Sequence, residues 1–115
     1  MKKYENDEIR KKIGLFNREA CKSNFDISVK DTNNEILIVS QFTLYSDTKK
    51  GRRPSFTEAA PPEIASELFN ELVTKFEQTG VVTKTGKFQS HMVVEIINDG
   101  PVTLLIDSKD KINKP

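Results

Sequence analysis

The chain has 115 residues, of which 36% are hydrophobic and 30% charged. This length suits a single domain, residues 1–115, which would bury roughly two thirds of its unfolded surface on folding. No apolar stretch approaches the ~20 residues that a membrane-spanning helix needs, and the lone Cys21 cannot form an internal disulfide. We therefore expect a soluble, cytoplasmic protein. The charged start, Met1 to Asp7, lacks a following apolar segment and predicts no secretory signal.

The net charge of +1 conceals a local positive excess. Up to Thr57 the chain carries 12 basic and 8 acidic residues, and after it 6 and 9. Much of the excess lies in one short run that could neutralise phosphates, Lys49-Lys50-Gly51-Arg52-Arg53. On charge alone, a solvated turn is the simpler interpretation of this run.

The first half of the chain predicts a helix and then a hairpin. Residues 4–15 are mostly charged, and Ile9, Ile13 and Phe16 follow the spacing of a short amphipathic helix. The segment 25–29 alternates with the period of a half-buried strand, and 31–34 is turn-forming. The run 35–39 is apolar and β-branched, which predicts a central strand covered on both faces.

The second half predicts a loop, one long helix and three strands. Residues 46–56 contain Gly51 and Pro54 and are expected to form a long exposed loop. A helix should begin at Pro61-Pro62-Glu63 and end near Gly80. Its apolar stripe is wide enough to cover a sheet. Segments 81–85, 92–97 and 102–106 are strand-like, and residues 108–115 are expected to fray.

Several classes of catalytic site are disfavoured by the residues present. His91 and Cys21 are the only histidine and cysteine, and neither lies in a nucleophile motif. No metal-ligand spacing and no glycine-rich nucleotide motif occurs, so we expect neither a metal nor a cofactor. With two Tyr and no Trp, a broad groove that stacks nucleic-acid bases is not indicated either.

What remains is a site built from hydroxyls, one amide side chain and backbone groups. Ser40, Gln41 and Thr43 follow one apolar run, and Gly100-Pro101 lies between two others. Backbone N–H groups at a strand end can stabilise an oxyanion, and loss of one such donor typically costs ~3–4 kcal/mol. From the spacing alone, a strand that simply ends in polar residues remains the simpler alternative.

Two segments resemble the signatures of the D-aminoacyl-tRNA deacylase family. Ser40-Gln41-Phe42-Thr43-Leu44 resembles its Ser-Gln-x-Thr motif, and Asn98-Asp99-Gly100-Pro101-Val102-Thr103 resembles its Asn-x-Gly-Pro motif. Segments 49–56, 59–62 and 85–88 also follow the family's order and spacing. The likeness extends from about Asn24 to Ser108.

The resemblance implies an enzyme that hydrolyses the ester of D-aminoacyl-tRNA, and also of glycyl-tRNA. It implies a homodimer whose sites lie at the subunit interface. Gly100-Pro101 would be a cis peptide inserted into the partner's site, where an L side chain would collide with it. Asn98 belongs to the same substrate-binding motif.

The remaining roles are also carried over from the resemblance. Ser40, Gln41, Phe42 and Thr43 would form the catalytic pocket, with the N–H groups of Phe42 and Thr43 as oxyanion donors. The 2′-hydroxyl of the tRNA ribose would assist the attack, and a nucleophilic Thr43 is the less favoured version. The loop residues that would approach tRNA phosphates are Lys49, Lys50, Arg52 and Arg53.

The resemblance also implies the fold class and shows one departure from it. We expect an α/β (α+β) domain with a barrel-like, mixed or antiparallel sheet and one long covering helix. Family members begin with about three strands that precede the first helix here, and residues 14–24 match poorly. Two alternatives stay open: a non-catalytic tRNA or nucleic-acid binding module, and an editing enzyme of different chirality or tRNA preference.

Overall fold

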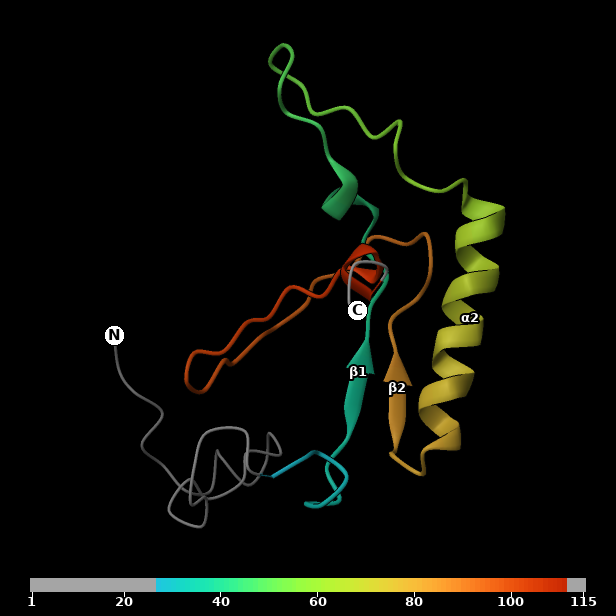
Figure 1. Ribbon diagram of the computed structural model, residues 1–115, viewed down its shortest axis with the longest axis vertical. Helices are drawn as coiled ribbons and strands as arrows, with labels where there is room; N and C mark the ends of the chain where they lie inside the picture. Colours follow the sequence, from blue (N-terminus) through green and yellow to red (C-terminus); the bar gives the residue numbers. More distant parts are fainter. Residues whose placement is uncertain (1–26, 112–115) are drawn as a thin grey trace.

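The computed structural model describes residues 27–111. Figure 1 shows strand β1 (Ile36–Ile38), helix α2 (Pro62–Gln78) and strand β2 (Thr83–Thr85) lying side by side. Two short 3-10 helices complete the elements, η2 (Phe42–Tyr45) and η3 (Ser108–Lys111). The helix predicted over residues 4–15 lies outside the described residues.

Strands β1 and β2 form a parallel pair, joined by a long crossover that contains α2. Ile36 lies opposite Thr83, and Ile38 lies opposite Thr85. The backbone N–H of Gly86 donates to the carbonyl of Ile38 at 3.1 Å and extends the pairing by one residue. A crossover of this kind is what a parallel pair requires, since a tight hairpin can join only antiparallel strands.

The predicted barrel-like sheet is not formed by the described residues, where the sheet has two strands. Within residues 27–111 an antiparallel contact occurs only as an isolated bridge between Asp47 and Ser55. The expectation that 35–39 is covered on both faces is also wrong for these residues, because Leu37 is 59% exposed. The α/β class with one long helix is confirmed.

Helix α2 begins and ends where the sequence predicts. Pro62 opens it without loss of a hydrogen bond, because the first N–H groups of a helix have no partner within it. Its apolar stripe divides into two rows. Ala65, Phe69, Val73 and Phe76 are half-buried, whereas Ile64, Leu68 and Leu72 are 53%, 58% and 44% exposed.

The predicted strand over residues 25–29 is wrong for residues 27–29, which form a bend and the start of a turn. The Asp31 carboxylate accepts hydrogen bonds from the N–H of Ser28 at 2.9 Å and from its hydroxyl at 2.8 Å. The bond from the Ser28 backbone is the main reason why the pKa of Asp31 is lowered. Local side-chain bonds of this kind compete with strand pairing.

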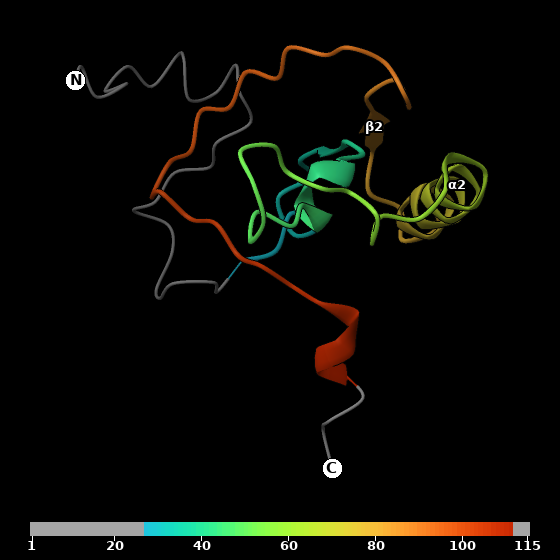
Figure 2. The ribbon, with the colours of Figure 1, turned by 90° about the horizontal axis from the view of Figure 1, so that it is seen from above.

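The predicted strands over 92–97 and 102–106 are extended segments without strand pairing. We call residues 92–106 the arm. Figure 2 shows the arm leaving the region of β2, turning, and returning to η3. Its apolar side chains are open to solvent, since Val93, Ile96 and Leu105 are 90%, 76% and 88% exposed.

No residue of the described part of the chain is fully buried, polar or apolar. Helix α2 contacts β2, and beyond the end of β2 the ring of Phe88 lies 5.9 Å from that of Phe69 on α2. No helix in residues 27–111 is long and apolar enough to cross a membrane. The described elements therefore leave a sheet and an arm whose apolar surfaces have no cover of their own.

Candidate functional site

The segment from Ser40 to Thr43 follows the end of β1 and enters η2. The polar groups of this segment therefore lie at a strand end, as the sequence predicts. Ser40 and Thr43 are half-buried and Gln41 is exposed. The side-chain amide of Gln41 donates a hydrogen bond to the hydroxyl oxygen of Thr43. Gln41 and Thr43 therefore form one small polar cluster, which Ser40 directly precedes in the chain.

Backbone donors are available at the start of η2. The first N–H groups of a helix have no partner within it, and Gln41 does not cap them with its side chain. These groups include the N–H of Phe42 and of Thr43. Two neighbouring free donors beside a polar cluster can receive a carbonyl oxygen that becomes negative during ester attack.

Thr43 itself has no base within reach among the described residues. Its hydroxyl is held by the Gln41 amide, which is a donor here. A threonine nucleophile needs an adjacent general base, and no carboxylate or imidazole of residues 27–111 is hydrogen-bonded to it. Within the described residues a nucleophilic Thr43 would therefore have no hydrogen-bonded base.

The loop that follows Ile97 is closed by one side chain. The amide of Asn98 donates to the carbonyl of Val102 at 2.9 Å and to the Thr103 hydroxyl at 3.2 Å. Its oxygen accepts from the N–H of Val102 at 2.7 Å. An asparagine suits this position because it combines a donor and an acceptor, which an aspartate cannot do.

Inside this loop the peptide bond between Gly100 and Pro101 is cis, as the resemblance implies. Gly100 has φ of 151°, a conformation that L side chains rarely adopt. A Cβ at Gly100 would lie 2.9 Å from the backbone nitrogen of Val102. The backbone of the loop therefore has no room for a side chain at this position.

The structure does not bring the two motif segments together within one chain. The turn of the arm that holds Gly100 and Pro101 lies far from η2 in both views of the ribbon (Figures 1 and 2). A pocket containing both segments therefore cannot be assembled from this conformation of a single copy.

The predicted loop closes on itself between Asp47 and Ser55, and we call residues 47–55 the basic loop. The N–H of Asp47 donates to the Ser55 carbonyl at 2.7 Å, and the N–H of Ser55 donates back at 2.8 Å. Its four cations are exposed and form no ion pair with another described residue: Lys49, Lys50, Arg52 and Arg53. They are free to meet anions from solution.

Sequence reasoning missed one contact that links this loop to the site. The rings of Phe42 and Phe56 meet edge to face, with centroids 5.0 Å apart and planes at 73°. Phe56 follows the basic loop directly, and Phe42 opens η2. Nothing in the spacing of the two residues signals the contact, because it depends on how the loop folds back.

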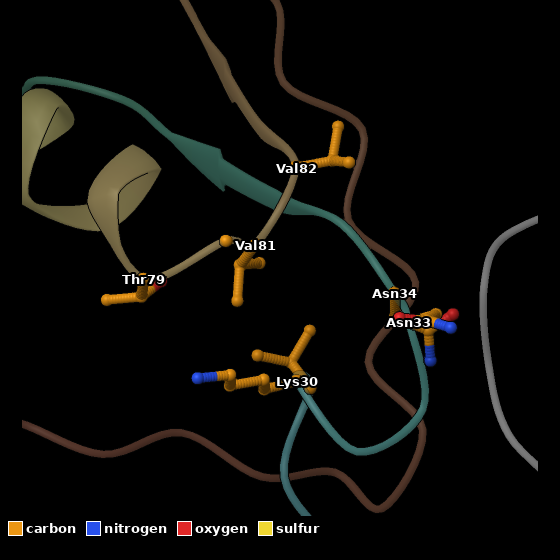
Figure 3. A pocket seen from close by; sticks show the side chains of 8 residues that line it. Lys30, Asn33, Asn34, Thr79, Val81 and Val82 are labelled. Atoms are coloured by element: carbon orange, nitrogen blue, oxygen red, sulfur yellow. The ribbon is translucent and has the colours of Figure 1, made fainter.

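A shallow hollow lies elsewhere, between the turn at residues 29–34 and the segment after α2 (Figure 3). The amides of Asn33 and Asn34 point away from Val81 and Lys30 in this view. None of the predicted site residues contributes to it, and its members are Val29, Lys30, Asn33, Asn34, Thr79, Gly80, Val81 and Val82. It shows no arrangement of catalytic groups.

Among the residues that the structure describes, no group of three or more His, Cys, Asp or Glu could hold a metal ion. His91 is exposed and directly precedes the arm. Cys21 lies outside the described residues.

Comparison with known proteins gives a consistent result. The sequence model of the family described as D-Tyr-tRNA(Tyr) deacylase matches residues 7–107. A D-aminoacyl-tRNA deacylase of Heliobacterium modesticaldum is 54% identical over 97 residues, which are 84% of this chain and 63% of the relative. The D-aminoacyl-tRNA deacylase of Carboxydothermus hydrogenoformans is 56% identical over 89 residues, which are 77% of this chain and 61% of the relative.

A third relative, the D-aminoacyl-tRNA deacylase of Desulforamulus reducens, is 50% identical over 107 residues, which are 93% of this chain and 70% of the relative. The chain thus spans less than two thirds of the length of the first two relatives. The matched region nevertheless includes both motif segments and the basic loop.

Proposed function

Because this chain belongs to the D-Tyr-tRNA(Tyr) deacylase family, we propose that it hydrolyses the ester between a D-amino acid and tRNA. Glycyl-tRNA would be a second substrate. The observation that carries the proposal is the family match over residues 7–107, which includes both motif segments. Hydrolysis would release free tRNA and the D-amino acid, a proofreading reaction of translation that we place in the cytoplasm.

The ester carbonyl would bind at the start of η2. In this arrangement the free N–H groups of Phe42 and Thr43 stabilise the developing oxyanion, and Ser40 and Gln41 line the pocket. One such donor typically lowers the barrier by ~3–4 kcal/mol, which suits an ester that is already activated. The 2′-hydroxyl of the ribose assists the attack, in agreement with the lack of a base hydrogen-bonded to Thr43 in the described chain.

The loop of Gly100 and Pro101 would select the D-amino acid. Its backbone carbonyls face the α-amino group and Cα of the substrate, so that an L side chain points into rigid backbone. Asn98 supports this role because it binds the backbone of Val102 through both its donor and its acceptor.

A second copy of the chain would supply this loop. The distance between the turn of the arm and η2 in one copy supports a homodimer in which each copy completes the other's pocket (Figure 1). The exposed apolar side chains of the arm support it as well, because they would be covered at such an interface. Further strands packed on β1 and β2 would complete the barrel-like sheet.

The basic loop would bind the phosphates of the acceptor stem. Its four exposed cations have no ion pair in the described chain, so a phosphate would meet them without competition from a carboxylate. No metal or cofactor is part of the proposed reaction.

The test compares hydrolysis of D-tyrosyl-tRNA and L-tyrosyl-tRNA by the purified chain, with its oligomeric state measured in the same preparation. D-selective release of tyrosine by a dimer is expected. Gly80→Ala serves as a control for substitution of a glycine with positive φ. Gly80 has φ of 86° but follows the end of α2, outside the proposed pocket. This variant should retain the selectivity.

A folded dimer that binds tRNA but releases neither amino acid would favour the non-catalytic binding module. Equal release from both substrates would instead favour an editing enzyme of different chirality.

A further inference from the structure

The chain from Phe42 to Phe56 folds back on itself and is held by three successive contacts. The N–H of Ser46 donates to the Thr43 carbonyl at 3.1 Å, which ends η2. The paired bonds between Asp47 and Ser55 then close the basic loop. Finally, the ring of Phe56 returns to that of Phe42 at 5.0 Å.

This arrangement attaches both ends of the basic loop to the segment that holds the free N–H groups. One end continues directly from η2, and the other is held by the aromatic contact. Edge-to-face pairs have a preferred geometry, so the contact restricts orientation as well as distance. A loop attached at one end only would leave its cations free to move relative to η2.

We propose that Phe56 is a positioning residue, whose contact with Phe42 holds the basic loop at a fixed place relative to Ser40–Thr43. Phosphate binding at the loop then orients the ester of the same tRNA for attack. The proposal rests on the proposed function and adds a role to it: binding energy from a remote part of the substrate is used at the reacting group.

The kinetic test uses D-tyrosyl-tRNA and the D-tyrosyl ester of adenosine, which lacks the acceptor stem. Phe56→Ala should lower kcat for the tRNA substrate by between about tenfold and 100-fold, because misplacement by about 1 Å has an effect of this size. KM for the tRNA should change little, since the loop cations remain. Hydrolysis of the adenosine ester should be unchanged.

A double-mutant cycle tests the link between the aromatic contact and the cations. The variant Lys49→Ala/Arg52→Ala should lower kcat for the tRNA substrate in the parent chain. In the Phe56→Ala background the same double substitution should lower kcat much less. It should still reduce the salt dependence of tRNA binding, by about one unit of slope for each cation removed.

Phe88→Ala is the matched control. It removes a second aromatic pair, between Phe88 and Phe69, that lies outside the basic loop and η2. Any change in kcat should therefore be the same for the tRNA substrate and the adenosine ester. Phe56→Tyr keeps the ring and should restore the parent kcat. This variant also separates loss of the contact from a general failure to fold.

A structural measurement is independent of activity. Hydrogen exchange of the amides of Asp47 and Ser55 should accelerate in Phe56→Ala and not in Phe88→Ala. Unchanged exchange, or an equal loss of kcat on both substrates, would overturn the positioning role. A parent chain that hydrolyses neither substrate would contradict the proposed function, and the exchange rates would then still decide whether Phe56 fixes the loop.

Discussion

Ser40, Gln41 and Thr43, the residues that we propose to line the hydrolytic pocket, include no acidic or basic side chain. The Gln41 amide donates to the Thr43 hydroxyl oxygen, and no carboxylate or imidazole of residues 27–111 is hydrogen-bonded to that hydroxyl. In the proposed reaction the groups that act on the ester are the N–H groups at the start of η2, whose position depends on the backbone alone.

Replacement of Thr43 by alanine tests this division of roles. Thr43→Ala keeps both backbone donors, so we expect kcat/KM to stay within about tenfold of the parent value, a change of about 1.4 kcal/mol. The measurement is single-turnover hydrolysis of D-tyrosyl-tRNA, with the fold checked by circular dichroism. A loss of about 10⁴-fold or more in a folded variant would identify Thr43 as the nucleophile instead.

Gly100 gives the second prediction at this scale. Gly100→Ala places a Cβ 2.9 Å from the Val102 nitrogen, and this backbone atom cannot rotate away. The strain is expected to be about 1–3 kcal/mol, and the loop should shift to relieve it. The ratio of D- to L-tyrosyl-tRNA hydrolysis should therefore fall.

Gly80→Ala is again the control, because its Cβ would meet nothing within 4 Å although its φ is 86°. It should lower stability by about 1 kcal/mol and leave the ratio unchanged. An unchanged ratio in Gly100→Ala would contradict the selective role of the loop.

At the scale of elements, α2 has more apolar surface than the described sheet covers. One row of its side chains packs toward β2 and the segment after it, where Phe69 meets Phe88. The neighbouring row of Ile64, Leu68 and Leu72 remains exposed. Apolar side chains exposed along one row of a helix are typical of a surface that another element or chain covers.

Two substitutions one residue apart measure this cover. Phe69→Ala should lower the free energy of unfolding by about 1–3 kcal/mol, from lost apolar area and the aromatic pair. If the row of Ile64, Leu68 and Leu72 stays exposed, Leu68→Ala should change the free energy of unfolding by less than about 0.5 kcal/mol. A loss of about 2 kcal/mol or more in Leu68→Ala would show that this row is covered in solution. Denaturation by urea, monitored by circular dichroism, gives both values.

At the scale of the whole molecule, the described chain lacks a closed core. None of residues 27–111 counts as fully buried, and the arm exposes Val93, Ile96, Leu104, Leu105 and Ile106. A domain is stable only when such surface is removed from water. The association that we propose would cover the arm and bring Gly100 to a second copy.

A charge placed on the arm should weaken this association. Ile96 is 76% exposed in one copy, so Ile96→Lys is tolerated by the isolated chain but not at an apolar interface. We expect the dimer dissociation constant to rise by at least tenfold, about 1.4 kcal/mol. Analytical ultracentrifugation over a range of concentrations measures it.

Glu95→Lys is the matched control, because it introduces the same side chain one residue earlier, where an exposed charge already lies. It should leave the dimer largely intact. Identical behaviour of the two variants would argue against the arm as an interface.

The elements with strong local signals were predicted from sequence. Pro62 and Gly80 bound α2, the apolar run at 36–38 became β1, and Gly51 and Pro54 mark an exposed loop. The motif residues were also found by sequence, because motifs depend on residue identity and order. Their catalytic and binding roles stay predictions.

The misses have two causes, the lack of a distant pairing partner and a local side-chain hydrogen bond. Residues 92–97 and 102–106 have the composition of strands, yet a strand exists only when another backbone pairs with it. The turn at 28–31 overrides an alternating pattern through the Asp31 carboxylate.

The sequence by itself therefore determined the family, the motif residues and the long helix, because these depend on residue identity and local spacing. The tertiary structure alone decided the contact of Phe42 with Phe56, the closure of the basic loop, and the separation of the arm from η2. Each of these joins residues far apart in the chain, and such contacts depend on the path of the backbone between them.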